Sequence, residues 1–166
     1  MNQLALLTDD QLVVIVQTTG NSRAFSELVH RHQTNLCAFL IRSTGNRSMA
    51  EDLTQETFII SYNKIASFKH DSSFKTWLFS IGYREFLQSK RKSNAFLKMI
   101  ERFKDSASPE KIVNSDMDLN IDLQKALNQL SPQQRAAVLL CDACGMSHSE
   151  ASTAMDVPLG SLKTYV

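Results

Sequence analysis

The sequence predicts an all-α protein built from two small helical domains, and three observations support this fold class. Apolar residues recur at spacings of three and four over most of the 166 residues, and no stretch shows the strict alternation of a strand. Hydrophobic residues make up 43% of the chain, with only five glycines and three prolines, which suits packed helical cores. Residues 105–119 are polar and lack this periodicity, so we expect a flexible linker between domains at 1–104 and 120–166.

Capping signals and glycines set the helices expected in the first domain. Gln11 follows Thr8 by three residues, and Glu51 follows Ser48 by three, so each pair has the form of a capping box. The chain breaks at Gly20–Asn21 and at Gly45. The expected helices cover residues 8–18, 22–44, 48–65 and 74–92, the last bending at Ser93–Asn94 before 96–103. The core face expected for the third helix consists of Met49, Leu53, Thr57 and Ile60.

The second domain has the layout of a helix-turn-helix unit. Ser131 is a typical N-cap before Pro132, and Ser147 forms a capping box with Glu150. We expect helices at residues 121–130, 131–145 and 147–155, a turn at 156–158 and a last helix from 159.

In a helix-turn-helix unit the last helix enters the major groove, and the start of the preceding helix contacts phosphates. The candidate DNA-binding residues here are Ser147, His148, Ser149, Leu159, Gly160, Ser161, Lys163 and Thr164. The alternative is a three-helix bundle without a DNA role.

Several protein classes are excluded by the same sequence. The longest apolar run, Ala136–Cys141, has six residues, so no segment is expected to enter a membrane. Asp9 and Asp10 stand where a signal peptide would be basic and then apolar. The three cysteines cannot all pair, which favours a reducing compartment, so we expect a cytoplasmic protein.

The net charge of +1 conceals a strongly polarised chain. Residues 1–60 carry a balance of −2, residues 61–104 a balance of +7 and residues 105–166 a balance of −4. A basic centre between acidic ends indicates a polyanionic partner for the middle segment. A solvated basic helix is the alternative on charge alone.

The helix expected at 48–65 has a second face, separate from its core face. This face is acidic and amidic with one aliphatic residue, and it consists of Asp52, Gln55, Glu56 and Ile59. Such a surface suits a basic protein partner, although an ordinary solvated face has the same composition.

The helix after residue 74 carries a stripe suited to unstacked bases. Trp77 offers a stacking surface, Gln88 an amide that can read a base edge, and Arg84 a cation for phosphates. The loop before it could line a pocket for an extruded base. The candidate residues are Phe68, Lys69, His70, Ser72 and Ser73 in the loop, and Trp77, Ser80, Arg84, Gln88, Lys90, Arg91 and Lys92 in the helix. For Trp77, core packing is the alternative.

The pair Cys141 and Cys144, with His148 nearby, does not predict a metal site. Zinc needs four ligands and only three lie close together in the sequence. A thioredoxin-type motif needs a βαβ context that is absent. We expect no metal and no cofactor, with the cysteines, and likewise His30 and His32, acting as core or surface residues.

Two groups of motifs resemble the sigma-70 family of bacterial RNA polymerase sigma factors, in its small two-domain extracytoplasmic-function class. Glu51–Phe58 (EDLTQETF) and Phe68–Phe79 (FKHDSSFKTWLF) resemble region 2. Leu130–Leu140 (LSPQQRAAVLL), Gly145–Ser147 and Val157–Lys163 (VPLGSLK) resemble region 4. The resemblance covers most of the chain in the family's order.

This resemblance implies a non-enzymatic subunit that directs RNA polymerase to promoters. Asp52, Gln55, Glu56 and Ile59 would dock on the clamp helices of the β′ subunit, with further contacts to the β subunit. The residues of the loop and stripe would open and read the −10 element as a single strand. The residues of the helix-turn-helix unit would bind the −35 duplex. An anti-sigma factor would be a further partner.

Three features depart from the family pattern. The family's recognition helix continues beyond the position of Val166, so we expect either a truncated second domain or impaired −35 binding. Arg84 and Gln88 stand where the family often has Asn or Asp, which predicts an unusual −10 preference. Cys141 and Cys144 replace ordinary helix residues. A truncated sigma-like decoy and a stand-alone helix-turn-helix repressor remain alternatives.

Overall fold

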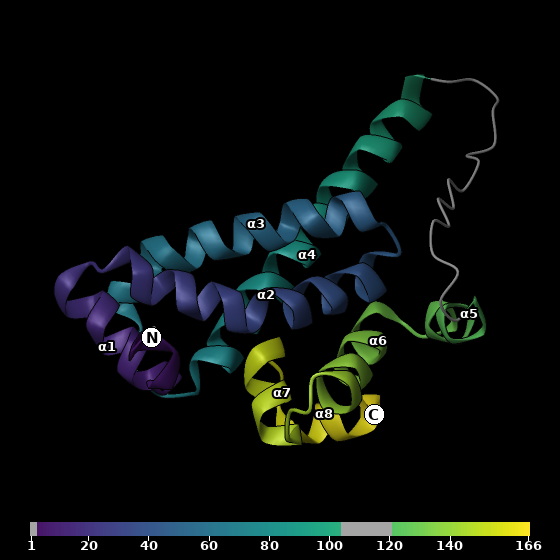
Figure 1. The fold of residues 1–166 in the computed structure, drawn as a ribbon. Helices are drawn as coiled ribbons and strands as arrows, with labels where there is room; N and C mark the ends of the chain where they lie inside the picture. The colour runs from purple at the N-terminus through teal and green to yellow at the C-terminus, as the bar shows by residue number, and fades with distance from the viewer. Residues whose placement is uncertain (1–2, 104–120) are drawn as a thin grey trace.

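The computed structural model describes residues 3–103 and 121–166, and within these ranges every regular element is a helix (Figure 1). The first domain begins with a 3₁₀ turn, η1, and has a second one, η2, before its last helix. Its elements are η1 (Gln3–Leu6), α1 (Asp9–Thr19), α2 (Ser22–Thr44), α3 (Arg47–Lys64), η2 (Ile65–Ser67) and α4 (Phe74–Phe103). The second domain comprises α5 (Ile121–Gln129), α6 (Pro132–Val138), the π-helical turn η3 (Leu139–Ala143), α7 (His148–Met155) and α8 (Leu159–Tyr165).

The all-α, two-domain prediction is confirmed, while the expected linker at 105–119 lies outside the described residues. None of the helices in the described part of the chain is long and apolar enough to cross a membrane.

Most of the predicted helix caps are present. Thr8 and Ser147 form the expected capping boxes with Gln11 and Glu150, and Ser131 caps α6 ahead of Pro132. Gly45 ends α2 in the left-handed conformation at φ 69°, where a side chain would be strained. The local chemistry of these residues is therefore sufficient to set the ends of α1, α2, α6 and α7.

The predicted N-cap of α3, Ser48, is wrong. Asn46, and not Ser48, is the N-cap, and its side chain accepts a hydrogen bond from the Met49 amide at 2.9 Å. Glu51 instead forms an ion pair with Arg47, one turn earlier, at 2.9 Å. Asparagine is as effective an N-cap as serine, so the capping-box pattern alone did not decide between the two.

The core face predicted for α3 is only partly correct. Thr57 is buried as expected, but Met49, Leu53 and Ile60 are only half-buried. The buried residues of this helix are Ala50, Thr54, Thr57, Phe58 and Ser61. Small residues face the neighbouring helices because they allow the backbones to approach closely, and the apolar pattern alone does not reveal this.

The expected bend in α4 does not occur, since the helix runs unbroken from Phe74 to Phe103. Its second half projects from the helical bundle (Figure 1). Phe96, Leu97 and Met99 are consequently exposed. Ser93 and Asn94 are weak helix formers, and they are tolerated inside the helix without breaking it.

The first core lies where α2, α3 and α4 meet. Its largest buried side chains are aromatic, and Phe39 and Phe79 have ring centroids 5.7 Å apart. Gly82 of α4 is the point of closest approach, because a Cβ atom there would lie 2.9 Å from Leu36 Cδ1 and 3.5 Å from Thr57 Oγ1. Helices α3 and α4, which carry candidate surfaces, are thus packed tightly against α2 and against each other.

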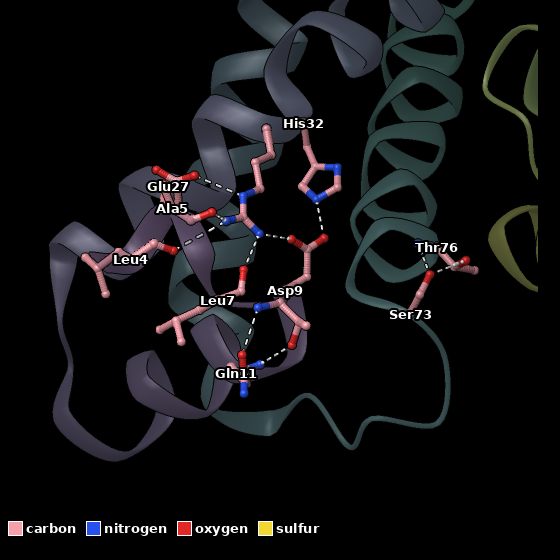
Figure 2. Close-up of polar contacts among 11 residues, drawn as sticks. Leu4, Ala5, Leu7, Asp9, Gln11, Glu27, His32, Ser73 and Thr76 are labelled. Carbon is pink, nitrogen blue, oxygen red and sulfur yellow. Dashed lines mark hydrogen bonds and ion pairs between the residues drawn. The ribbon is translucent and has the colours of Figure 1, made fainter. Parts of the chain in front are cut away.

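A polar network fastens the N-terminus to α2 (Figure 2). The guanidinium of Arg31 donates to the backbone carbonyls of Leu4, Ala5 and Leu7 and pairs with Asp9 and Glu27, each at 3.0 Å. This single side chain therefore holds η1 and the start of α1 against α2.

The second domain packs against the first. Helix α7 lies on α4, and the Lys75 ammonium of α4 donates to the Cys144 carbonyl. Arg135 of α6 donates to the carbonyl of Ser43 at 3.4 Å and to that of Leu127 at 2.8 Å. Arg135 is half-buried at this contact, and burial lowers the pKa of its guanidinium.

Candidate nucleic-acid and protein interface

Helix α3 presents the acidic and amidic face that the sequence predicted. Asp52, Gln55, Glu56 and Ile59 are all exposed, and Ile59 is 56% exposed. Within the residues that the structure describes, the polar side chains of this face make no ion pair or hydrogen bond. Free carboxylates beside an exposed aliphatic residue are suited to a partner that is both basic and apolar.

The face extends one turn further than predicted. Tyr62 follows Ile59 by three residues and is 42% exposed, while its ring packs edge-on to Phe25 at 4.9 Å. The helix was expected to reach residue 65, so Tyr62 could have been assigned to this face from its spacing of three residues from Ile59. Tyr62 joins the face as a partly supported aromatic anchor, a type of residue that often dominates binding energy.

In the loop from 68 to 73, the role predicted for Phe68 needs correction. The Phe68 side chain is only 7% exposed, so it does not line an open base pocket. It packs between Trp77 and His70, with ring centroids 4.8 Å from each. Trp77 is half-buried against Phe74 as well, so both alternatives for this residue, packing and exposure, are partly realised.

The polar residues of this loop lie at the surface. Lys69, His70 and Ser73 are exposed, and Ser72 is half-buried. Ser73 also caps α4, because its Oγ accepts from the Thr76 amide at 3.1 Å (Figure 2). His70 has a left-handed backbone, with φ 59°.

Gln17 of α1 contacts this loop, a contact that was not predicted from the sequence. Its amide nitrogen donates to the carbonyls of Ile65 and Phe68, at 2.8 and 2.9 Å, and its oxygen lies 3.1 Å from His70 Nε2. A contact between residues about fifty positions apart has no local sequence pattern.

The α4 stripe is presented as predicted, with one exception. Arg84, Gln88, Arg91 and Lys92 are exposed and Ser80 is half-buried. Lys90 is half-buried instead, with its ammonium 5.7 Å from the centre of the Phe86 ring. Burial and then the charge of Arg135 lower the pKa of Lys90, which lies beside the stripe as predicted but is less exposed than Lys92.

The stripe and the domain contact lie on opposite sides of α4. Arg84 follows Lys75 by nine residues, which is two and a half turns at 3.6 residues per turn, so the two side chains point to opposite sides of the helix. The packing of α7 therefore leaves the Arg84 side open.

The helix-turn-helix layout is confirmed in α6, α7 and α8. At the start of α7, His148 and Ser149 are exposed, and Ser147 donates through its backbone and side chain to Glu150, which lowers the pKa of that carboxyl. In α8, Leu162 is fully buried, which directs Gly160, Lys163 and Thr164 outwards and leaves Ser161 half-buried. Leu159 is exposed as well.

The cysteines and histidines do not form a reactive or metal-binding cluster in the described part of the chain. Burial raises the pKa of the Cys144 thiol to about 11, so almost no reactive thiolate is present near neutral pH. His32 is buried and pairs with Asp9, whereas His30 is exposed. No three potential metal ligands gather among the described residues.

The chain matches the models of a known protein family. Residues 28–96 match the Sigma-70 region 2 model, and residues 120–166 match the Sigma-70, region 4 model. The ECF RNA polymerase sigma factor SigE of Mycolicibacterium smegmatis is 33% identical over 161 residues, which cover 92% of this chain and 62% of that protein. The ECF RNA polymerase sigma-E factor of Escherichia coli K12 is 30% identical, over 96% of this chain and 89% of that protein.

A solved structure agrees with these matches. The sigma factor RpoE, crystallised with the anti-sigma factor NepR from Bartonella quintana, superposes with a TM-score of 0.71 at 32% identity, over 86% of this chain and 89% of that one. The chain therefore belongs to the sigma-70 family of RNA polymerase sigma factors, in its extracytoplasmic-function class.

Proposed function

We propose that this chain is a non-enzymatic promoter-specificity subunit, which binds the RNA polymerase core through α3 and reads promoter DNA through α4 and α8. The observation that carries the proposal is the separation of two open surfaces in one rigid domain. The α3 face offers Asp52, Gln55, Glu56, Ile59 and Tyr62 to a protein, and the α4 stripe offers Arg84, Gln88 and Arg91 to a nucleic acid.

The electrostatics support this division of roles. The α3 face lacks cations between residues 48 and 62, so it would repel phosphates and attract basic side chains. On α4, Arg84 and Arg91 are exposed on one face about two turns apart, a spacing that suits a phosphate backbone. Lys69, His70, Ser72 and Ser73 lie in the loop just before this helix, and Trp77 in its first turn, where they can meet bases that have left the duplex.

The second domain supplies the duplex contacts in this proposal. His148, Ser149, Lys163 and Thr164 are exposed at the positions where a helix-turn-helix unit meets phosphates and base edges. The match of residues 28–96 to region 2 favours a polymerase subunit over a stand-alone repressor.

We further propose that an anti-sigma factor controls the chain, in the compartment that holds RNA polymerase. This is supported by the similarity to a sigma factor that was crystallised with its anti-sigma factor.

The test is run-off transcription with purified core polymerase and a library of promoter fragments. We expect transcripts that depend on this chain, and a large loss of core affinity in the double variant Asp52→Lys with Glu56→Lys. The matched control, Asp10→Lys with Asp142→Lys, makes the same change of charge at exposed positions away from α3.

Three results would contradict the proposal. Core binding without transcripts would indicate a decoy, and duplex binding without core binding would indicate a repressor. Equal core affinity of the α3 variant and its control would refute the docking face.

A further inference from the structure

The side chain of Gln17 uses its hydrogen-bonding groups on the loop that precedes α4. Both hydrogens of its amide nitrogen have an acceptor, because Nε2 lies 2.8 Å from the Ile65 carbonyl and 2.9 Å from the Phe68 carbonyl. Its oxygen lies 3.1 Å from His70 Nε2. One half-buried side chain of α1 therefore holds three points of a segment six residues long.

This arrangement also fixes the tautomer of His70. Because the Gln17 nitrogen donates twice, its oxygen is the only group left to face the imidazole, and an oxygen can only accept. His70 Nε2 must then carry the hydrogen, and in the neutral ring Nδ1 is free to accept one.

The backbone of His70 requires such support. A left-handed φ of 59° is uncommon for a residue with a side chain, and such conformations persist where the surroundings impose them. The surroundings here are the Phe68 ring, 4.8 Å from the imidazole, and Gln17. Without Gln17, the segment between Ile65 and His70 loses its side-chain hydrogen bonds to α1.

We propose that Gln17 is a positioning residue for single-strand recognition: it holds the 68–73 loop in the shape that receives an unpaired base and presents His70 Nδ1 to it. The inference rests on the proposed function and deepens it. Gln17 lies before the segment that matches region 2, so α1 adds a part to the reading loop from outside that segment.

The test uses Gln17→Glu, which preserves the shape and one acceptor but removes both donors and sets a carboxylate against two carbonyls. Gln17→Ala, which removes the whole amide and keeps a good helix former, guards against misfolding of the first variant. Gln33→Glu makes the same chemical change at an exposed position of α2. The readouts are core affinity, the rate of promoter opening, and transcription from promoters substituted at each base of the opened strand.

We expect Gln17→Glu and Gln17→Ala to slow opening about tenfold, which corresponds to about 1.4 kcal/mol, and to lose discrimination at one base position. Core affinity should match that of Gln33→Glu. Some loss of thermal stability is expected, because the Ile65 and Phe68 carbonyls lose their donor, but both variants should be fully folded at the assay temperature. Wild-type base discrimination in both Gln17 variants overturns the inference and leaves the proposed function intact. An equal loss of core affinity, opening and thermal stability also overturns it, since that pattern indicates a general structural role. If the wild-type chain neither opens promoters nor discriminates bases, the proposed function and this inference fail together.

Discussion

The carboxylate of Asp9 lies 2.6 Å from Nε2 of the buried His32, and the same carboxylate pairs with Arg31 (Figure 2). The hydrogen bond to His32 is the largest cause that lowers the Asp9 pKa, and the interactions with Arg31 add to it. A carboxyl whose pKa is lower in the folded chain stabilises the fold above its unfolded pKa and loses that contribution as the pH falls.

Asp9→Asn is therefore expected to lower the free energy of unfolding by about 1–2 kcal/mol at pH 7. It should also make stability less dependent on pH below about 4, where an ordinary aspartate becomes protonated. Urea unfolding between pH 3 and 7 measures both effects. Asp10→Asn, at the exposed neighbouring position, is the control, and an equal pH dependence of the wild type and Asp9→Asn would contradict the assignment.

Arg84→Ala with Gln88→Ala should reduce promoter opening at least tenfold, because the stripe loses one phosphate contact and one base contact of about 1 kcal/mol or more each. Core affinity should not change, since the α3 face is untouched. Opening is measured with a fluorescent base in the −10 element. If core affinity falls as well, the two surfaces are not separate.

Gly82→Val should destabilise the first domain by about 2 kcal/mol, because a branched side chain has no room between Leu36 and Thr57. Thermal unfolding of the full chain measures this loss. Gly160→Val is the control for glycine replacement in a helix, since a Cβ atom at Gly160 meets open space. Equal stability of the two variants would show that the packing at Gly82 is loose.

Lys75→Ala with Arg135→Ala should separate the domains in the free chain, because each removes a donor to a carbonyl of the other domain. We expect the ratio of closed to open chains to fall about tenfold, because two hydrogen bonds of about 0.5–1 kcal/mol each are lost. Energy transfer between dyes on α1 and α8 reports the change. An unchanged transfer efficiency would mean that apolar packing alone holds the domains together.

The features predicted correctly from the sequence are the ones that local chemistry determines. Thr8, Ser131 and Ser147 cap helices because their side chains reach amides a few residues away. The exposure of Asp52 and Arg84 follows from helical periodicity once the helices are placed. Two errors were local, namely the N-cap of α3 at Asn46 and the absent bend in α4. The other features that were wrong or missed depend on packing against other elements.

Burial of Phe68, the partial burial of Lys90 and the contacts of Gln17 could not be predicted from the sequence. Each is set by the way a loop or helix packs on an element that lies many residues away. The core face of α3 belongs to the same class, because close packing favours Ala50 and Ser61 over larger apolar residues.

The contact between α4 and α7 joins two domains of one polypeptide. Its strength therefore depends on the covalent connection between the domains as well as on the interface itself. Two domains joined within one polypeptide meet at an effective concentration that can reach about a millimolar. A contact too weak to assemble the separated domains at micromolar concentration can still keep the intact chain closed. Dilution does not open such a chain, whereas a polymerase or a promoter that binds both domains at a wider spacing does.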